Sequence, residues 1–302
     1  MNWIEKLKQG FKSKKLSSVT QKRWLYIAND FLDFLKQKNI SVTQVTPQTI
    51  RDYLGYKSKK MNSNALKTTY YALKSIFKIW GNKQLFEELE DDIPRGYEPE
   101  RPFFTLEETK KIIKSAKERY KQRKDWIGLR DLVMILISAE TGTRRIQLQR
   151  LNRENFTKEK TLKIPPSFKG GSWTTRKLRK ETIKYIEEYL KKREERLDVF
   201  ANKPDSPLFI DKSNKRISPE AMGWIFGEIK KQAGITKSGQ FHGFRRGKTT
   251  RLAKGGMSEI EITKVMGWKE GSKEPHIYAQ LDQNEIQDKA YKVDELMEDE
   301  EI

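Results

Sequence analysis

Four residues near the end of the chain have the types and spacing needed to handle a phosphodiester without a metal ion. His242 and Arg245 are three positions apart, so one face of a helix would carry both. Trp268 follows a helical pattern, and Tyr278 lies ten residues after it. A His and an Arg can hold the charge on phosphate oxygens, and a Tyr hydroxyl can attack the phosphorus. The set predicts nucleophilic chemistry at a phosphate.

A second stretch, TGTRRIQLQRL at residues 141–151, adds a further arginine. Gly142 permits a sharp turn, and Arg144 would then stand at the start of a new helix. A helix N-terminus already attracts anions, and an Arg there adds a bidentate phosphate ligand. Taken alone this motif is weak, because an Arg after a turn is more often a solvated charge.

The charge of the chain indicates a polyanionic partner. The 302 residues include 62 Lys and Arg against 42 Asp and Glu, a net charge of +20. This balance favours nucleic acid first and an anionic membrane second. Residues 1–86 hold 17 basic and 4 acidic side chains, a net of +13, whereas residues 281–302 hold 2 and 9, a net of −7. We expect DNA contact at the basic end and protein contact at the acidic end.

Composition also excludes several kinds of site. The chain has no Cys and only two His, which excludes disulfides, zinc sites with Cys ligands and His-rich metal sites. We expect neither a metal nor a cofactor. No run of about 18 apolar residues predicts a membrane span, and residues 1–15 lack the apolar core of a secretory signal. A cytoplasmic protein is the simplest inference.

A small helical domain is predicted for residues 1–90. Apolar side chains recur at helical spacing over three segments, and no strand pattern competes: 17–38, 46–55 and 64–80. The basic residues around the second and third segments are either a solvated face or contacts to backbone phosphates, and we favour the second reading. The lysines expected to bind DNA are Lys57, Lys59, Lys60 and Lys67. Residues 91–102, with acidic side chains, Pro and Gly, are predicted to be a linker.

A catalytic domain is predicted for residues 103–302. Thr105 and Glu108 form a capping box that opens a helix through Ala116. Residues 126–139 are apolar nearly all round, which predicts a central buried helix. A hairpin with strands at 161–164 and 173–178 is expected next, followed by a helix at 181–196 and a short strand at 207–210. The remaining elements expected are a helix from Ser218, the helix of His242 and Arg245, a helix from Ser258 and a last helix at 283–298. The helix from Ser258 is expected to pack Ile260, Ile262, Val265 and Met266 inward. The fold class is therefore mainly α with a small β-hairpin.

In chain order, the motifs Thr-Gly-x-Arg, His-x-x-Arg, Gly-Trp and Tyr resemble those of the tyrosine recombinases, the phage integrase family, in its Xer-like or archaeal and viral branches. The resemblance implies a SAM-like helical core-binding domain that clamps one side of a DNA duplex, followed by an α+β catalytic domain. Three positions depart from the family's pattern. Gln147 stands where Glu is usual, Trp268 where His is more common, and Tyr278 comes one residue later than is common.

The resemblance also implies roles for residues of this chain. Lys163 and Lys177 are alternatives to Lys169 as the hairpin lysine that protonates the leaving oxygen, and His276 is a lower-ranked alternative to His242 in proton transfer. Arg145 and Arg246 are expected to face DNA. The catalytic residues implied are Tyr278 as nucleophile, Arg144 and Arg245 as stabilisers of the transition state, His242 as acid, base or donor, Lys169 as the group that protonates the leaving 5′ oxygen, and Trp268 as a supporting group.

The activity implied is site-specific recombination, in which DNA is cut and rejoined through a 3′-phosphotyrosyl intermediate without metal or ATP. The expected partners are double-stranded DNA with specific recombination sites and further copies of this chain, as a tetramer on DNA and a monomer without it. The acidic last helix would dock on its own domain or on a neighbouring copy. Three alternatives stay open: a type IB topoisomerase-like enzyme, a non-cleaving DNA-binding protein on the same fold, and a basic structural or RNA-binding protein.

Overall fold

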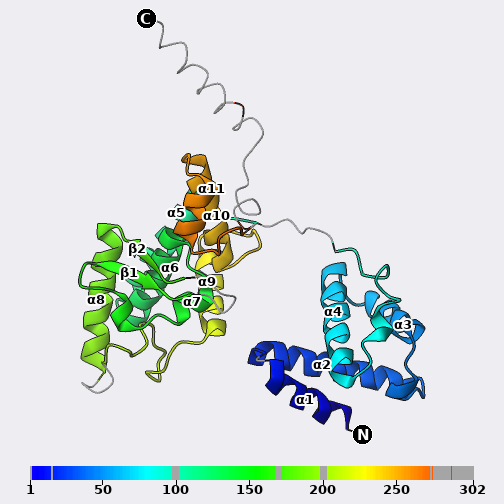
Figure 1. Cartoon of the computed structure of the whole chain (residues 1–302). Coiled ribbons are helices and arrows are strands. Elements are labelled where there is room, and N and C mark those ends of the chain that lie inside the picture. The colour runs from blue at the N-terminus through cyan, green and yellow to red at the C-terminus, as the bar shows by residue number, and fades with distance from the viewer. Residues whose placement is uncertain are drawn as a thin grey trace, which may run out of the picture. The chain divides into compact units, whose positions relative to one another are not determined.

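The computed structural model describes residues 2–14, 16–96, 102–166, 172–197, 203–272, 274 and 287. The chain divides into two compact units, Met1–Glu100 and Arg101–Ile302, which are treated one at a time (Figure 1). The predicted linker at 91–102 spans this boundary. Helices dominate both units, and the described residues hold one two-stranded antiparallel sheet. The predicted fold class is confirmed.

The first unit is a bundle of helices around an aromatic core. Its elements are α1 (Trp3–Lys14), α2 (Ser18–Gln37), α3 (Pro47–Ser58) and α4 (Ser63–Trp80), with 3₁₀ turns η1 (Val42–Gln44) and η2 (Gln84–Phe86). Phe31 lies at the centre, with Tyr53 and Phe77 edge-on at centroid distances of 4.9 and 5.7 Å. The apolar side chains that recur at helical spacing in α2, α3 and α4 thus form this core. Helix α3 runs to Ser58, three residues past the predicted end at Gly55.

Helix α1 was not expected from the sequence. Leu7 and Phe11, at i and i+4, are its buried residues, and Lys and Glu side chains surround them. Trp80 at the end of α4 holds this helix in place, because its Nε1 donates to Trp3 O at 2.9 Å and its carbonyl accepts from Lys6 Nζ at 2.6 Å. The segment has only four apolar residues, Trp3, Ile4, Leu7 and Phe11, so contact with α2 and α4 decides that it is helical.

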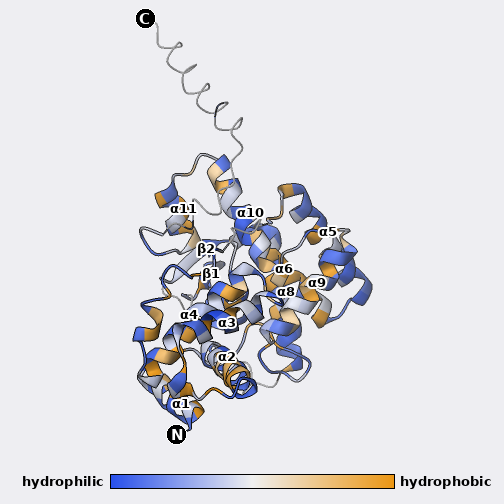
Figure 2. Ribbon diagram, turned by 90° about the vertical axis from the view of Figure 1, so that its right-hand side faces the viewer, coloured by the Kyte–Doolittle hydropathy of each residue, from blue (hydrophilic) through white to orange (hydrophobic). Residues whose placement is uncertain are grey.

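The second unit is built around one helix that is buried on almost every side. Its elements are α5 (Leu106–Arg123), α6 (Trp126–Thr141), α7 (Arg145–Gln149), η3 (Arg153–Asn155), β1 (Thr161–Ile164), β2 (Thr174–Lys177), α8 (Lys180–Arg196), α9 (Pro219–Gln232), α10 (Phe241–Lys254) and α11 (Glu259–Met266). Helix α6 is central and packs against α5, α8 and α10 (Figure 1). Figure 2 shows that most other helices carry both hydrophobic and hydrophilic positions. The predicted central helix is confirmed.

Three local predictions need correction. Helix α5 continues to Arg123 rather than ending at Ala116, because Lys124 forms its left-handed C-cap only there. The segment 207–210 is not a strand but makes isolated bridges, Asn152 with Pro207 and Ile210 with Arg216. Ile260 does not pack inward: it is 68% exposed, whereas Ile262 and Met266 on the same helix are buried. A helix of eight residues on the surface buries one face only.

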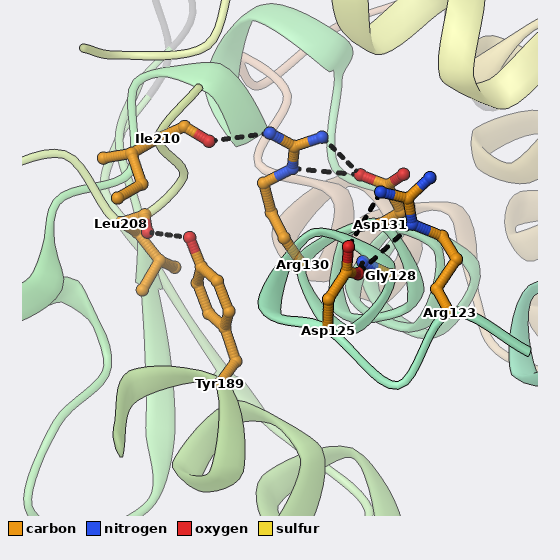
Figure 3. A network of polar contacts seen from close by, with 8 residues as sticks. All are labelled: Arg123, Asp125, Gly128, Arg130, Asp131, Tyr189, Leu208 and Ile210. Carbon is orange, nitrogen blue, oxygen red and sulfur yellow. Dashed lines mark hydrogen bonds and ion pairs between the residues drawn. The ribbon is translucent and has the colours of Figure 1, made fainter. Parts of the chain in front are cut away.

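A polar network anchors the first half of α6 (Figure 3). Asp125 caps the helix by accepting from Gly128 N at 2.8 Å. Arg130 is buried, donates to Asp131 Oδ1 at 2.7 and 2.9 Å, and donates to Ile210 O at 2.8 Å. From α8, Tyr189 donates to Leu208 O at 3.0 Å. The network ties the 208–210 segment to α6 and α8, and so holds the helix whose other end carries Gly142.

Candidate active site

The turn after α6 brings Arg144 to its place. Gly142 is the left-handed C-cap of α6 with φ +66°, a conformation that favours glycine. A Cβ at this position would lie 2.9 Å from Met266 Cε and 3.4 Å from Arg245 Cα, so the turn is packed tightly against α10 and α11. Arg144 is the N-cap of α7, which confirms its predicted location at the start of a helix.

Helix α10 carries His242 and Arg245 and is seated on the start of the second unit. Phe104 N donates to Gly243 O at 3.2 Å. A Cβ on Gly247 would lie 2.2 Å from Phe104 O, so only glycine permits this approach. These contacts with Phe104 fix the position of α10, and therefore of its side chains, relative to the turn at Gly142.

Arg245 joins three segments of the site. Its side chain is almost fully buried, with 2% of its area exposed. Its Nη1 donates to Gly142 O at 2.9 Å and its Nη2 to Met266 O at 2.8 Å. The guanidinium carbon lies 4.8 Å from the centroid of the Trp268 ring, which is within the range of a cation–π contact. Arg245 therefore holds the α6 turn, the end of α11 and Trp268 together.

His242 lies in a cationic environment. The residue is exposed to solvent, although neighbouring protein atoms partly desolvate its imidazole. Burial, followed by the charges of Arg245, Arg246 and Arg144, lowers the pKa of His242 to about 4, and Glu274 opposes the change. The imidazole is therefore neutral at pH 7 and has one donor and one acceptor nitrogen. A phosphate bound among these arginines would remove part of the repulsion and raise the pKa.

Trp268 packs in a small apolar cluster of its own. It is 7% exposed and lies with Ala253, Ile262 and Met266, separate from the main core of the unit. Its backbone N–H donates to Thr263 O at 3.0 Å, and Gly267 before it is the left-handed C-cap of α11. The indole thus shields one face of Arg245. A supporting role for Trp268, without proton transfer, is consistent with this position.

Helix α7 reaches the chain that leaves strand β1, a link that the sequence did not predict. Gln147 is buried, accepts from Arg144 N at 3.3 Å and donates from Nε2 to Pro165 O at 2.6 Å. Arg150 Nη1 donates to Pro166 O at 3.2 Å. The Gln147 side chain therefore joins the Arg144 turn to the hairpin. The sequence signal for this link is the pair of prolines directly after the strand. Proline has no backbone N–H, so its backbone can take part in such a link only as a carbonyl acceptor.

The hairpin is confirmed with the register Thr161 to Lys177 and Ile164 to Thr174. Lys163 and Lys177, the alternatives for the hairpin lysine, are both exposed. The remaining residues predicted for this chemistry, Lys169, His276 and Tyr278, lie outside the described residues, as does the predicted last helix at 283–298 except for residue 287.

The proposed DNA-binding residues have different surroundings. Lys59 and Lys60 are exposed, and Lys67 is partly buried. Lys57 differs, because it is 7% exposed and its Nζ lies 2.9 Å from Asp30 Oδ1. A buried ammonium paired with a carboxylate is not available to a phosphate, so we leave Lys57 out of the DNA surface.

In the second unit, the two arginines expected to face DNA each bind a neighbouring group. Arg145 Nη1 donates to Gln240 Oε1 at 3.0 Å, and Arg246 Nη1 donates to Pro102 O at 3.2 Å. Both side chains remain partly accessible. Within the described ranges, no helix is long and apolar enough to cross a membrane, and no three ligating side chains gather at one point.

Comparison with known proteins adds independent information. Residues 102–285 match the model of the phage integrase family. The chain is 21% identical over 250 residues to tyrosine recombinase XerC of Leptospira interrogans, with 78% of this chain and 75% of that protein covered. It is 28% identical over 228 residues to tyrosine recombinase XerA of Pyrococcus horikoshii, with 72% of each covered.

Solved structures agree on the fold. The site-specific recombinase XerH bound to difH substrate, before cleavage, matches with a TM-score of 0.69 at 17% identity, over 91% of this chain and 81% of that one. A lambda integrase tetramer bound to a Holliday junction matches with a TM-score of 0.65 at 15% identity, over 91% and 76%. Because the family model covers more than half of the chain and includes the Arg144 turn and the whole of α10, the chain belongs to the phage integrase family.

Proposed function

We propose that this protein is a site-specific DNA recombinase that cuts and rejoins strands through a 3′-phosphotyrosyl intermediate. The observation that carries the proposal is the meeting of three groups at one turn. Arg245 binds the carbonyl of Gly142, Arg144 follows two residues later, and the charge of Arg144 reaches His242. Two arginines and a neutral histidine at one point suit a phosphate that gains charge in its transition state.

The proposed reaction has two matched halves. The Tyr278 hydroxyl releases its proton to solvent and its oxygen forms a bond to the scissile phosphorus while the bond from phosphorus to the 5′ oxygen breaks, and Lys169 gives that oxygen its proton. Arg144 and Arg245 hold the charge on the remaining phosphate oxygens. His242, neutral in the free protein, donates one hydrogen bond to the phosphate. Attack by a 5′-hydroxyl from the partner strand reverses the step and releases Tyr278, so the bond energy is conserved and no ATP is consumed.

We also propose that Lys59, Lys60 and Lys67 of the first unit, with Arg145 and Arg246 of the second, contact the DNA backbone. The net charge of +13 over residues 1–86 supports this. Assembly into a tetramer on paired DNA sites is proposed because proteins of similar fold include a lambda integrase dimer on a core site and a tetramer on a Holliday junction. The free protein is proposed to be a monomer, and a cytoplasmic location stays a prediction.

The alternatives are less well supported. The curated relatives are recombinases, which does not favour a topoisomerase-like enzyme or a non-cleaving protein. A basic structural or RNA-binding protein would not need the convergence of Arg144, His242 and Arg245.

Covalent trapping tests the proposal. The full chain is incubated with labelled DNA in EDTA and denatured with SDS, and DNA that stays on the protein is measured. Tyr278→Phe should abolish the adduct, whereas Tyr291→Phe, a matched change at another tyrosine near the end of the chain, should retain it. If only Tyr291→Phe lost the covalent adduct, the nucleophile would be Tyr291 and not Tyr278. If DNA that carries paired sites were relaxed but gave no recombinant products, the topoisomerase alternative would be favoured.

A further inference from the structure

A cluster of cations that the proposed reaction does not use lies around helix α10. Lys248 and Arg251 come from α10, Arg176 from β2 and Arg179 from the N-cap of α8; we call these four residues the Lys248 cluster. Lys248 and Arg251 are about 120° and about 180° round the helix axis from His242, so they leave α10 in other directions than the catalytic side chain. Lys248 feels the positive charges of the other three residues, Arg251 also feels that of Arg179, and Glu140 at the end of α6 is the acidic group near Lys248.

Glu140 already has its own partners. Its Oε1 accepts from the backbone N–H of Arg179, and its Oε2 accepts from Thr182 Oγ1 at 2.7 Å and lies 3.5 Å from Arg179 Nε. The carboxylate therefore caps the start of α8 and balances Arg179. Within the described part of the chain, no acidic side chain forms an ion pair with the other three members, Arg176, Lys248 and Arg251.

Donor groups of two of these cations, Arg176 and Arg251, lack acceptors among the described residues. Arg176 Nε and Arg251 Nη1 are buried, and neither finds a hydrogen-bond partner among the described residues. Arg251 Nη2 has one long contact, to Ala139 O at 3.4 Å. Burial alone lowers the pKa of Arg176 to about 10, and burial together with Arg251 lowers the pKa of Lys248. Buried donors without acceptors and cations that repel one another both destabilise a fold, so this arrangement calls for an anion.

The cluster adjoins the candidate active site. Lys248 Cβ lies 3.4 Å from where a Cβ would stand on Gly142, the residue whose carbonyl accepts from Arg245. An oxyanion with several acceptor oxygens matches donors that arrive from a strand and a helix, and guanidinium groups bind phosphate oxygens well. The geometry points to a phosphate-binding site at Arg176, Lys248 and Arg251, which in the DNA complex takes a backbone phosphate other than the scissile one. The second half of this inference rests on the proposed function, and free inorganic phosphate is the other source of the same chemistry.

The first arm of the test uses no DNA. Calorimetry of the full chain follows the unfolding of the second unit in chloride buffer and in inorganic phosphate at equal ionic strength. The wild type and Lys184→Met, a control at an exposed α8 lysine, should gain about 5–10 °C in Tm at a hundredfold excess over Kd. The double variant Arg176→Met, Lys248→Met should melt higher than the wild type in chloride, because repulsion is relieved, and should not respond to phosphate. Lys248→Met alone serves if the double variant loses its cooperative transition.

The second arm measures DNA affinity against salt concentration. In the double variant, the slope of log K against log salt should fall by about 0.9 for each phosphate that no longer has its cation, with no change in Lys184→Met. A phosphate response with an unchanged DNA slope would assign the site to free phosphate and refute the DNA half. No phosphate response, or the same response in the double variant, would refute the site itself. If the wild type bound no DNA, the proposed function would fail while the first arm still decided the site.

Discussion

Replacing Asp131 by Asn should be among the most damaging conservative changes in the second unit. Asp131 and Arg130 are 2% and 5% exposed, and the carboxylate accepts two hydrogen bonds from the guanidinium at 2.7 and 2.9 Å. Burial raises the pKa of the Asp131 carboxyl against the pull of Arg130, so the intact pair stabilises the fold only weakly. Removing one charge is different, because it leaves the other buried without compensation, at a cost of about 3–5 kcal/mol.

The magnitude can be checked by calorimetry and urea unfolding of the full chain. For a unit of this size the loss corresponds to a fall in Tm of roughly 6–20 °C. Asp125→Asn is the matched control: Asn still caps a helix, and the Arg123–Asp125 pair is 37% and 38% exposed, so the change should cost at most about 1 kcal/mol. The pair replacement Arg130→Met, Asp131→Leu should be close to neutral. If Asp131→Asn proved no worse than Asp125→Asn, the argument from the buried pair would be wrong.

Three further outcomes are expected. His242 should titrate near pH 4 in the free protein. Because its folded pKa lies below the usual 6.5, its contribution to stability is complete above about pH 6.5 and is lost as the pH falls towards 4. An NMR titration midpoint above about pH 6 would contradict this. Arg245→Lys should remove the covalent adduct and destabilise the second unit by about 2 kcal/mol or more, since an ammonium cannot bridge two carbonyls and stack on Trp268, and wild-type stability in urea would argue against that bridging role. Gln147→Met should cost about 1–3 kcal/mol by leaving Pro165 O without its donor, whereas unchanged unfolding would show that α7 does not hold the hairpin.

Local patterns were sufficient for most elements of the fold. The capping box at Thr105 and Glu108, the glycine after α6 and the Ser258 cap act within a few residues of each other, and all three form as predicted. The hairpin follows from alternation about a turn in the same way. Such signals are encoded in neighbouring side chains, so they can be recognised without the tertiary structure.

Burial of single side chains could not be predicted in that way. Lys57 lies in a basic stretch that looks solvated, yet its ammonium is buried and donates to Asp30, 27 residues earlier. Ile260 fits an apolar pattern, yet it is 68% exposed among the residues that the structure describes. The contact of Gln147 with Pro165 likewise joins residues 18 apart. In each case the deciding partner lies on another element, and spacing along the chain does not reveal it.

The sequence by itself therefore determined the family, the order of the elements and the residue types available for chemistry at a phosphate, because motif order and helical periodicity are properties of the chain. Only the tertiary structure decided that Arg245 holds the Gly142 turn and Trp268, that burial and three arginines lower the pKa of His242, and that buried donors of Arg176 and Arg251 find no acceptor among the described residues. These properties depend on distance and on exclusion of water between elements far apart in sequence, and packing alone sets both.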